Sequence, residues 1–133
     1  GGTEYTVSVI VNNLNQLIGI VPKKIILKQG ITLAAVVEKN QLISQACKKI
    51  ITQLRPHGPF NVQLKVYRHK VYIFEINPRL STTSVLTDKA FGNEIELYLR
   101  HFNQSKIVNP PHLKPGIYLY RYYENCFYKN AVA

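Results

Sequence analysis

The 133-residue chain contains no methionine, only two cysteines and only seven acidic residues. It has no apolar run near the roughly 18 residues that a membrane-spanning helix needs, and no targeting pattern stands at its start. These absences predict a cytoplasmic protein without membrane contact. The Gly-Gly start and the missing methionine lead us to expect a piece of a longer protein. The length fits one domain, whose core needs no disulfide.

The two cysteines, Cys47 and Cys126, lie far apart, and the chain has no Cys-x-x-Cys pair. This spacing argues against a zinc site. Cys47 falls within an apolar helical pattern and is predicted to be a small core residue. Nothing in the sequence supports a disulfide between the two, so reduced thiols are the expectation for a cytoplasmic chain.

Positive charge, in contrast, is abundant, with 17 Lys and Arg residues and a formal charge of +10. Such an excess indicates either solvated basic faces or a polyanionic partner, which includes nucleic acid, nucleotide and an anionic membrane surface. The densest groups, Lys23-Lys24 and Lys48-Lys49, fall short of the runs of about 5–8 that mark nucleic-acid patches. With so few acids in the chain, the position of each carboxylate becomes informative.

The hydrophobic pattern predicts an α+β fold with a mainly antiparallel sheet and two packed helices. Alternation predicts strands over residues 4–11, 16–22, 60–67 and 71–77. Apolar steps of three and four residues predict helices over residues 40–54 and 88–102. Residues 28–39 are expected to form a loop, 81–87 a polar link and 117–128 a strand-like tail.

A group of polar side chains lies on the two strands around Arg68-His69-Lys70. Side chains alternate along a strand, so Asn61 and Gln63 share one side, as do Glu75 and Asn77. A three-residue turn sets Gln63 opposite Glu75 and Asn61 opposite Asn77, and on the apolar side it sets Val62, Leu64 and Val66 opposite Ile76, Phe74 and Tyr72. A two-residue turn would mix the two faces, so we expect the three-residue turn.

The polar side of this hairpin offers one carboxylate and several amide oxygens, with Arg79 just beyond the strand end. Oxygen ligands suit Mg²⁺, which proteins hold through one or two carboxylates plus substrate phosphates. Arg79 is suited to clamp a phosphate through paired donors. The plainer alternative is an exposed sheet face on which Glu75 is merely solvated, and residue types alone favour it.

Four pieces of the sequence together resemble the C-terminal part of an ATP-grasp domain. They are Phe60-Asn-Val-Gln63, Glu75-Ile-Asn-Pro-Arg79, Ser81-Thr-Thr-Ser84 and Lys89-Ala-Phe-Gly92. The resemblance spans residues 4–102 and, within the family, points toward the large chain of carbamoyl-phosphate synthetase. It implies an incomplete ATP-grasp subdomain over residues 1–107 and a C-terminal strand or hairpin extension over residues 108–133.

The resemblance also implies roles for individual residues. Gln63, Glu75 and Asn77 match positions that hold two Mg²⁺ ions bridging the phosphates of ATP. Arg79 matches an arginine that contacts those phosphates or an acyl-phosphate intermediate, which makes it the candidate catalytic residue. Glu4 matches an acidic residue near the nucleotide. The implied activity is that of a carboxylate–amine ligase, in which ATP phosphorylates a small carboxylate substrate before an amine attacks.

Two departures from the family qualify this expectation. Thr82 stands where carbamoyl-phosphate synthetase has an arginine, which points to a relative with a different acceptor. The N-terminal ATP-grasp segment, with its phosphate-covering loop and lysines, is missing, and no glycine-rich phosphate loop replaces it. We therefore expect half a site, which binds Mg²⁺-ATP weakly and is inactive until it is joined to the missing segment.

Two other functions stay open. One is a basic nucleic-acid-binding module, because the aromatic and basic tail from Tyr118 to Lys129 has side chains that stack on bases. Against it, alternating aromatics are common in strands that bury one face, and the motifs of nucleic-acid-binding folds are absent. The other is a non-catalytic structural domain of ATP-grasp fold. The intact Gln63, Glu75, Asn77 and Arg79 argue against a decayed site.

Overall fold

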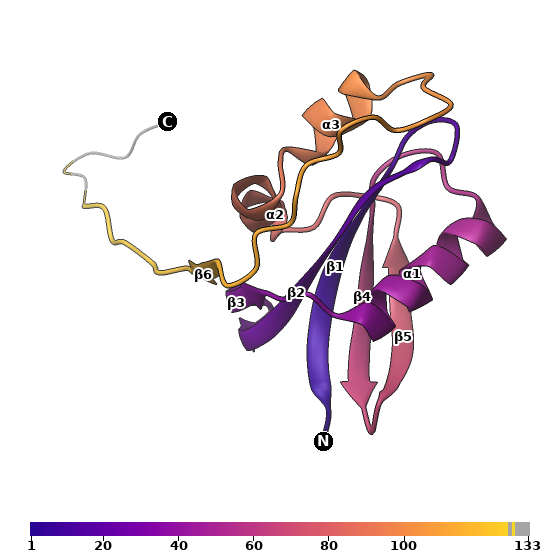
Figure 1. Cartoon of the computed structure of the whole chain (residues 1–133). Coiled ribbons are helices and arrows are strands. Elements are labelled where there is room, and N and C mark those ends of the chain that lie inside the picture. The colour runs from indigo at the N-terminus through magenta and orange to yellow at the C-terminus, as the bar shows by residue number, and fades with distance from the viewer. Residues whose placement is uncertain (128, 130–133) are drawn as a thin grey trace.

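A single antiparallel sheet forms the centre of the protein (Figure 1). The computed structural model describes residues 1–127 and residue 129. The sheet has six strands in the order β5-β4-β1-β2-β3-β6. The elements along the chain are β1 (Thr3–Val11), β2 (Leu17–Gln29), β3 (Ile31–Val37), α1 (Gln41–Leu54), β4 (Phe60–Tyr67), β5 (Lys70–Asn77), α2 (Ser84–Ala90), α3 (Glu94–Arg100) and β6 (Tyr118–Tyr120). The predicted α+β class with a mainly antiparallel sheet is confirmed.

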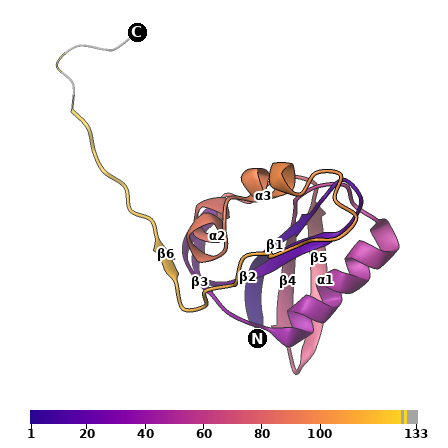
Figure 2. The same ribbon diagram turned by 45° about the horizontal axis from the view of Figure 1, so that its top comes forward.

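Helix α1 covers one face of the sheet (Figure 2). The side chain of Asn40 caps its first turn by accepting a hydrogen bond from the amide of Ile43 at 3.1 Å. The apolar stripe of α1, which includes Cys47, packs on the inward side chains of β1 and β4. The prediction that Cys47 is a core residue is thus confirmed, and burial raises the pKa of its thiol to about 12.

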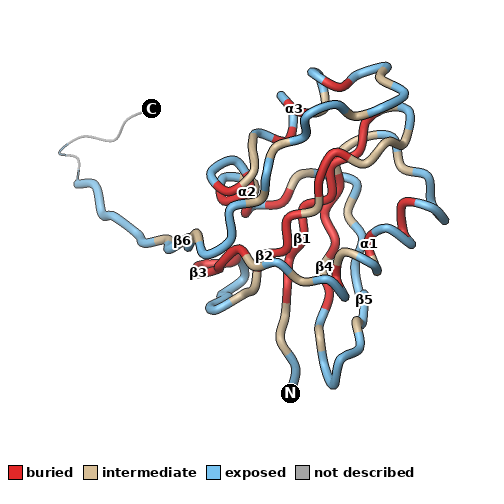
Figure 3. The backbone as a smooth tube through the Cα atoms, viewed as in Figure 1, coloured by how far each residue is buried: buried red, intermediate tan, exposed pale blue. Residues whose placement is uncertain are grey.

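Helices α2 and α3 cover the opposite face. Leu86 and Ala90 of α2 pack against Val21 of β2, and Leu97 of α3 packs against Ile10 and Ile18. The central strand β1 is therefore covered on both sides, and Figure 3 shows it buried over most of its length. Within the described residues, no helix combines the length and the apolar character that crossing a membrane requires.

The prediction of a loop over residues 28–39 is wrong. Strand β2 continues to Gln29, Gly30 makes the turn at a φ of 71°, and β3 follows directly. All residues of β3 after Ile31 are buried. A strand buried on both faces need not alternate between polar and apolar residues, which is why the pattern failed here.

The single helix expected over residues 88–102 is also wrong, and so is the polar link expected over residues 81–87. The chain instead forms two short helices, so that three helices pack on the sheet where two were expected. Gly92, at a φ of 148°, separates α2 from α3. The side chain of Asn93 then caps α3 by accepting hydrogen bonds from the amides of Ile95 and Glu96, both at 3.1 Å. The glycine and the capping asparagine were the signals for this break.

The β4–β5 hairpin combines a two-residue turn with a bulge. Arg68 and His69 form the turn at positive φ values of 46° and 59°, and Tyr67 pairs with Lys70. The register then shifts between Gln63 and Leu64, where Phe74 is an extra residue on β5. The three-residue turn was therefore a wrong prediction.

The bulge nevertheless restores the predicted pairing at the base of the hairpin. Gln63 pairs with Glu75, and Asn61 pairs with Asn77, as the sequence predicted. On the apolar side, the expected pair of Val62 with Ile76 is confirmed. The other two pairs were wrong, because Leu64 lies opposite Ile73 and Val66 lies opposite Val71.

The C-terminal segment joins the sheet at its far edge. Strand β6 pairs with β3, with Tyr118 opposite Val36 and Tyr120 opposite Ala34. Residues 121–127 follow without helix or strand, so the strand-like tail expected over residues 117–128 is limited to three residues among those described. Tyr128 lies outside the described residues.

Candidate functional site

Polar residues form two rows across the sheet on the side of α2. Directly paired residues of antiparallel strands place their side chains on the same face. Glu75, Gln63, Thr6 and Lys23 form one row, from β5 through β4 and β1 to β2. Asn77, Asn61 and Ser8 form the next. The opposite face of the same strands forms the apolar core under α1. Each strand therefore places apolar side chains on the α1 side and these polar side chains on the α2 side.

A cleft of about 180 Å³ opens beside these rows. Three segments enclose it: the sheet, the β2–β3 turn and the loop that follows β5. The lining residues are Thr6, Ile25, Lys28, Gly30, Ile31, Thr32, Asn61, Gln63, Arg79, Ser81 and Thr82. Its two basic side chains, Lys28 and Arg79, make the cleft suitable for an anion.

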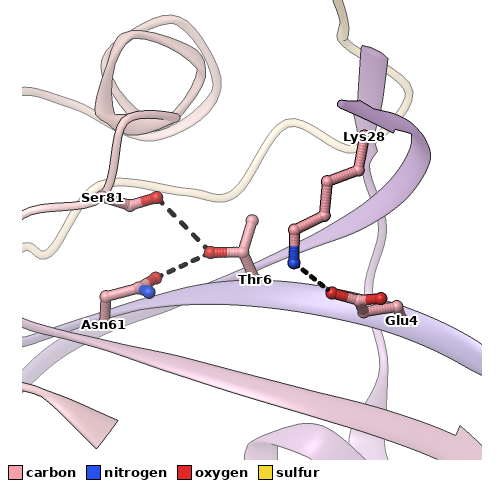
Figure 4. Close-up of polar contacts among 5 residues, drawn as sticks. All are labelled: Glu4, Thr6, Lys28, Asn61 and Ser81. Atoms are coloured by element: carbon pink, nitrogen blue, oxygen red, sulfur yellow. Dashed lines mark hydrogen bonds and ion pairs between the residues drawn. The ribbon is translucent and has the colours of Figure 1, made fainter. Parts of the chain in front are cut away.

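Hydrogen bonds among buried polar side chains attach the loop after β5 to the sheet (Figure 4). The Thr6 hydroxyl donates to Oδ1 of Asn61 at 2.8 Å and lies 3.4 Å from the hydroxyl of Ser81. Ser81 in turn lies 2.8 Å from the hydroxyl of Thr83 and accepts from the Thr83 amide at 3.1 Å. Since these groups are buried and bonded to one another, the loop that carries Arg79 has a defined path.

The charged groups at the cleft differ in how far they are neutralised. Lys28 Nζ lies 2.7 Å from Oε1 of Glu4, so these two form an ion pair at the rim (Figure 4). The exposed Arg79 side chain donates only to the carbonyl of Leu80, at 3.1 Å, and has no acidic partner among the described residues. Arg79 therefore keeps most of its donors for a ligand.

The five predicted site residues lie in the cleft or on the strands and side chains next to it. Gln63 and Arg79 line the cleft, and Glu4 contacts its lining residue Lys28. Glu75 and Asn77 lie on the neighbouring edge strand, opposite Gln63 and Asn61. Nδ2 of Asn77 is buried without a hydrogen-bond partner among the described residues. This nitrogen is a hydrogen-bond donor, so it suits an anionic oxygen of a ligand, whereas Mg²⁺ would take the amide oxygen.

The donor set of these residues fits Mg²⁺. Gln63, Glu75 and Asn77 supply one carboxylate and two amide groups in adjacent register. Within the described part of the chain, no three His, Cys, Asp or Glu side chains cluster as a metal cage. Magnesium commonly binds few protein oxygens and takes its other ligands from water and substrate phosphates, so a sparse set of this kind suits it.

Sequence reasoning missed one residue of this face, Lys23. Its side chain is fully buried, and its Nζ donates to the hydroxyls of Ser8 at 2.7 Å and Thr87 at 2.8 Å. Burial lowers its pKa to about 7, and the charge of Glu94 acts in the opposite direction. The available signal was a lysine at an inward position of a strand, between the apolar residues Val21 and Ile25.

The sheet, the cleft and the oxygen donors together define an ATP-grasp subdomain. A protein-family model described as "ATP-grasp in the biosynthetic pathway with Ter operon" matches residues 1–124. The chain therefore belongs to this ATP-grasp family.

Solved structures resemble the chain in fold. The phosphoribosylaminoimidazole carboxylase ATPase subunit from Aquifex aeolicus is 20% identical with a TM-score of 0.62, over 74% of this chain and 33% of that one. N5-carboxyaminoimidazole synthetase from Staphylococcus aureus, complexed with ADP, is 19% identical with a TM-score of 0.64, over 84% of this chain and 32% of that one. An ATP-grasp superfamily protein from Archaeoglobus fulgidus is 19% identical with a TM-score of 0.55, over 90% and 44%. The chain thus spans about a third of the first two structures.

Proposed function

We propose that this chain supplies the Mg²⁺- and phosphate-binding half of an ATP-grasp carboxylate–amine ligase in the cytoplasm. The observation that carries the proposal is the pairing of Gln63 with Glu75 and of Asn61 with Asn77, next to a cleft that Arg79 lines. Membership of the ATP-grasp family supports it, and so does the structural neighbour that was solved with ADP. The likeness to the carbamoyl-phosphate synthetase large chain stays a prediction.

Each residue of the site has a proposed role. Gln63, Glu75 and Asn77 hold Mg²⁺, which when bound neutralises charge on the transferring phosphoryl group. Arg79 binds the phosphate oxygens, or those of an acyl phosphate formed on a small carboxylate substrate, through its unpaired donors. Lys28 adds positive charge to the cleft, and Glu4, paired with it, contacts the nucleotide. Positioning and electrostatic stabilisation supply most of the catalysis of phosphoryl transfer, so these roles suffice for this half.

The proposal includes a second half that lies outside this chain. The cleft is open, with walls from one sheet and two loops. A missing N-terminal ATP-grasp segment would close over the nucleotide and exclude water from the phosphates. The chain alone should accordingly bind Mg²⁺-ATP weakly and have no ligase activity.

A titration of the chain with Mg²⁺-ATP tests the proposal. We expect shifts of the amide resonances of Gln63, Glu75 and Asn77 in nuclear magnetic resonance spectra. The double substitution Glu75→Gln with Asn77→Ala should weaken binding about tenfold or more, because it removes the carboxylate and one of the amides. The matched control is Glu124→Gln with Asn125→Ala, an acid–amide pair in the exposed tail. Equal binding by both double variants would refute the proposal.

A nucleic-acid-binding module remains the second candidate, favoured by the exposed aromatic tail. Tyr118 and Tyr120 stack with their ring centroids 6.0 Å apart, and both are exposed. Tyr122, Tyr123 and Phe127 are exposed as well. These rings are available to bases. Binding to single-stranded DNA that falls steeply with salt and needs neither Mg²⁺ nor ATP would favour this candidate.

A further inference from the structure

The C-terminal segment returns to the edge of the cleft after leaving α3. The amide of Lys114 donates to the carbonyl of Ala90 in α2 at 2.8 Å. Backbone bonds then join Ile117 to Val37, and the amide of Arg121 donates to the carbonyl of Leu33 at 2.8 Å. Figure 1 shows this segment running past α2 to β3 before the tail leaves the body. The segment is therefore attached to two elements that border the site.

The side chain of Arg121 joins the two walls of the cleft. Its Nη1 donates to the carbonyl of Thr32 on β3 at 3.2 Å. Its Nη2 donates to the carbonyl of Thr82, which lies 39 positions earlier in the chain. Both Thr32 and Thr82 line the cleft, one on the β2–β3 side and the other in the loop that carries Arg79. One guanidinium thus sets the distance between these two walls.

We propose that Arg121 is a positioning residue for the phosphate site, which makes the C-terminal segment part of that site and not a separate extension. By holding the carbonyl of Thr82 near β3, Arg121 fixes the distance between β3 and the loop that carries Arg79. The cleft between them then stays wide enough for a polyphosphate. This inference rests on the proposed function, because it concerns the same cleft. The ligand class is an inorganic or nucleotide polyphosphate with bound Mg²⁺.

Only an arginine has the shape for this contact. The planar guanidinium carries five donors in a fixed fork, whereas a lysine ammonium is a single point charge on a flexible stem. Two of the donors bridge carbonyls from different segments. The charge of Arg121 lies beside the lining residues Thr32 and Thr82 and adds to that of the unpaired Arg79, so it favours an anionic ligand.

The loop does not depend on Arg121 for its folding. Hydrogen bonds among Thr6, Ser81 and Thr83 hold its base on the sheet, so without Arg121 the loop loosens but stays attached. The C-terminal segment has its own attachment, because Leu113, Ile117 and Leu119 pack on the core between β3 and α2. A substitution at Arg121 should therefore leave the fold intact and change only the placement of the loop.

The test compares Arg121→Gln and Arg121→Lys with Arg100→Gln. The control removes an equal charge from α3, where Arg100 pairs with Glu96. The probe is Mg²⁺-tripolyphosphate, titrated into the full chain and followed through the amide resonances of Gln63 and Asn77. We expect Arg121→Gln to weaken binding about tenfold, and Arg121→Lys to recover only a minor part, because charge without the fork does not hold both carbonyls.

A second measurement, amide hydrogen exchange, reports on the loop without any ligand. The amides of Thr83 and Ser84 bond to Ser81 and should exchange faster in Arg121→Gln than in the unchanged chain or in Arg100→Gln. Binding of tripolyphosphate by Arg121→Gln as strong as by the unchanged chain would overturn this inference alone, as would equal losses in Arg100→Gln. Absence of binding by the unchanged chain would overturn the proposed function, and this inference with it.

Discussion

Lys23 has the most unusual environment of any charged residue described. Its ammonium group lies between β1, β2 and α2 with two hydroxyls as partners and no carboxylate within ion-pair distance. Burying a charge without a counter-charge is costly, so desolvation lowers the pKa of Lys23 to about 7. Glu94, itself buried with one unbonded oxygen, reduces this shift through its charge.

The first prediction concerns the pH dependence of stability. An unfolded lysine binds its proton up to about pH 10.5, whereas folded Lys23 releases it near pH 7. Between these values the unfolded state binds more protons, so the free energy of unfolding rises with pH. Lys23→Met removes this rise. Urea unfolding at about pH 6 and about pH 9 should show the unchanged chain gaining on the order of 2 kcal/mol relative to Lys23→Met.

Two other buried groups oppose this trend at higher pH. Burial raises the pKa of Cys47 to about 12 from 9.0, and burial together with Glu38 raises that of Tyr5 to about 12 from 10.0. Both make the folded state lose stability as pH rises above their unfolded values, and both remain in Lys23→Met. They therefore cancel in the comparison. Lys24→Met, which removes the neighbouring surface lysine, is the control, and a pH dependence in Lys23→Met equal to that of the unchanged chain would contradict the prediction.

At this scale the sequence predicted the pairing of the candidate metal-binding residues better than the environment of Lys23. The shared face of Gln63, Glu75 and Asn77 followed from the alternation of side chains along paired strands, and a sequence motif made these residues candidates. Lys23 was missed because alternation tells which way a side chain points but not what lies above it. The partners of Lys23 on the neighbouring elements, Ser8 and Thr87, are 15 and 64 positions away.

Among the elements, the β4–β5 hairpin shows how two local features combine. A two-residue turn fits the twist of the strands but requires positive φ at both residues. Arg68 and His69 adopt such values although neither is glycine or asparagine. The bulge at Phe74 then changes which side chains face the site.

The second prediction is that His69→Gly stabilises the hairpin. A non-glycine residue at positive φ costs about 1–2 kcal/mol, while the added freedom of a glycine in the unfolded chain costs about 0.5–1 kcal/mol. The net gain should be about 0.5–1 kcal/mol, seen as a higher melting temperature in calorimetry. Arg68 stays in place, with its guanidinium 5.1 Å above the ring of Tyr67.

Lys70→Gly is the matched control for this prediction. Lys70 lies in β5, next to the turn, at a position where φ is not positive. Glycine in a strand weakens it, so this variant should melt at a lower temperature than the unchanged chain. If His69→Gly also lowered the melting temperature, strain in the turn would be excluded as the dominant effect.

Elements were predictable where polar and apolar residues recur with a clear period, even in β1, which is buried on both faces. Helix α1 and strands β1 and β4 agree with expectation because their patterns have a clear period. Strand β3 did not, since it is buried on both faces and its apolar residues do not alternate with polar ones, and the tail did not, because its aromatic residues lie exposed. The two-residue turn was missed because a bulge gives the same pairing at Gln63 as a longer turn does.

For the whole molecule, close contact between Gly19 and Phe91 joins the sheet to the α2–α3 layer. A Cβ atom at Gly19 would lie 2.3 Å from Cζ of Phe91. Phe91 packs against both apolar clusters on this side of the sheet. The approach of the two layers thus depends on the missing side chain of one glycine.

The third prediction tests this contact with Gly19→Ala. Forcing a methyl group into a packed interface costs about 1–3 kcal/mol, because side chains or backbone must shift. Phe91→Leu should be destabilising alone, yet the double variant should be more stable than the sum of the two single losses predicts. Urea unfolding of the unchanged chain, the two single variants and the double variant measures the coupling free energy between the two residues. Additive losses would show that the two residues act independently.

Contacts between segments far apart in the chain could not be predicted from the sequence. Motif and alternation placed the polar face of β4 and β5, but nothing local shows that Arg121 meets Thr82 across 39 positions. The boundary expected near residue 107 followed the extent of the family resemblance along the chain. In the structure, residues on its C-terminal side bond to α2 and β3.

The bulge at Phe74 also separates the tip of the hairpin from its base. Because the extra residue resets the register, the pairing of Lys70 through Ile73 and the pairing of Glu75 through Asn77 are set independently. We therefore expect a change in the turn to alter the pairing of the tip only, and to leave the pairing beyond the bulge unchanged. A fluorescent label or an affinity tag inserted between Arg68 and His69 should therefore leave Gln63 paired with Glu75 and Asn61 paired with Asn77.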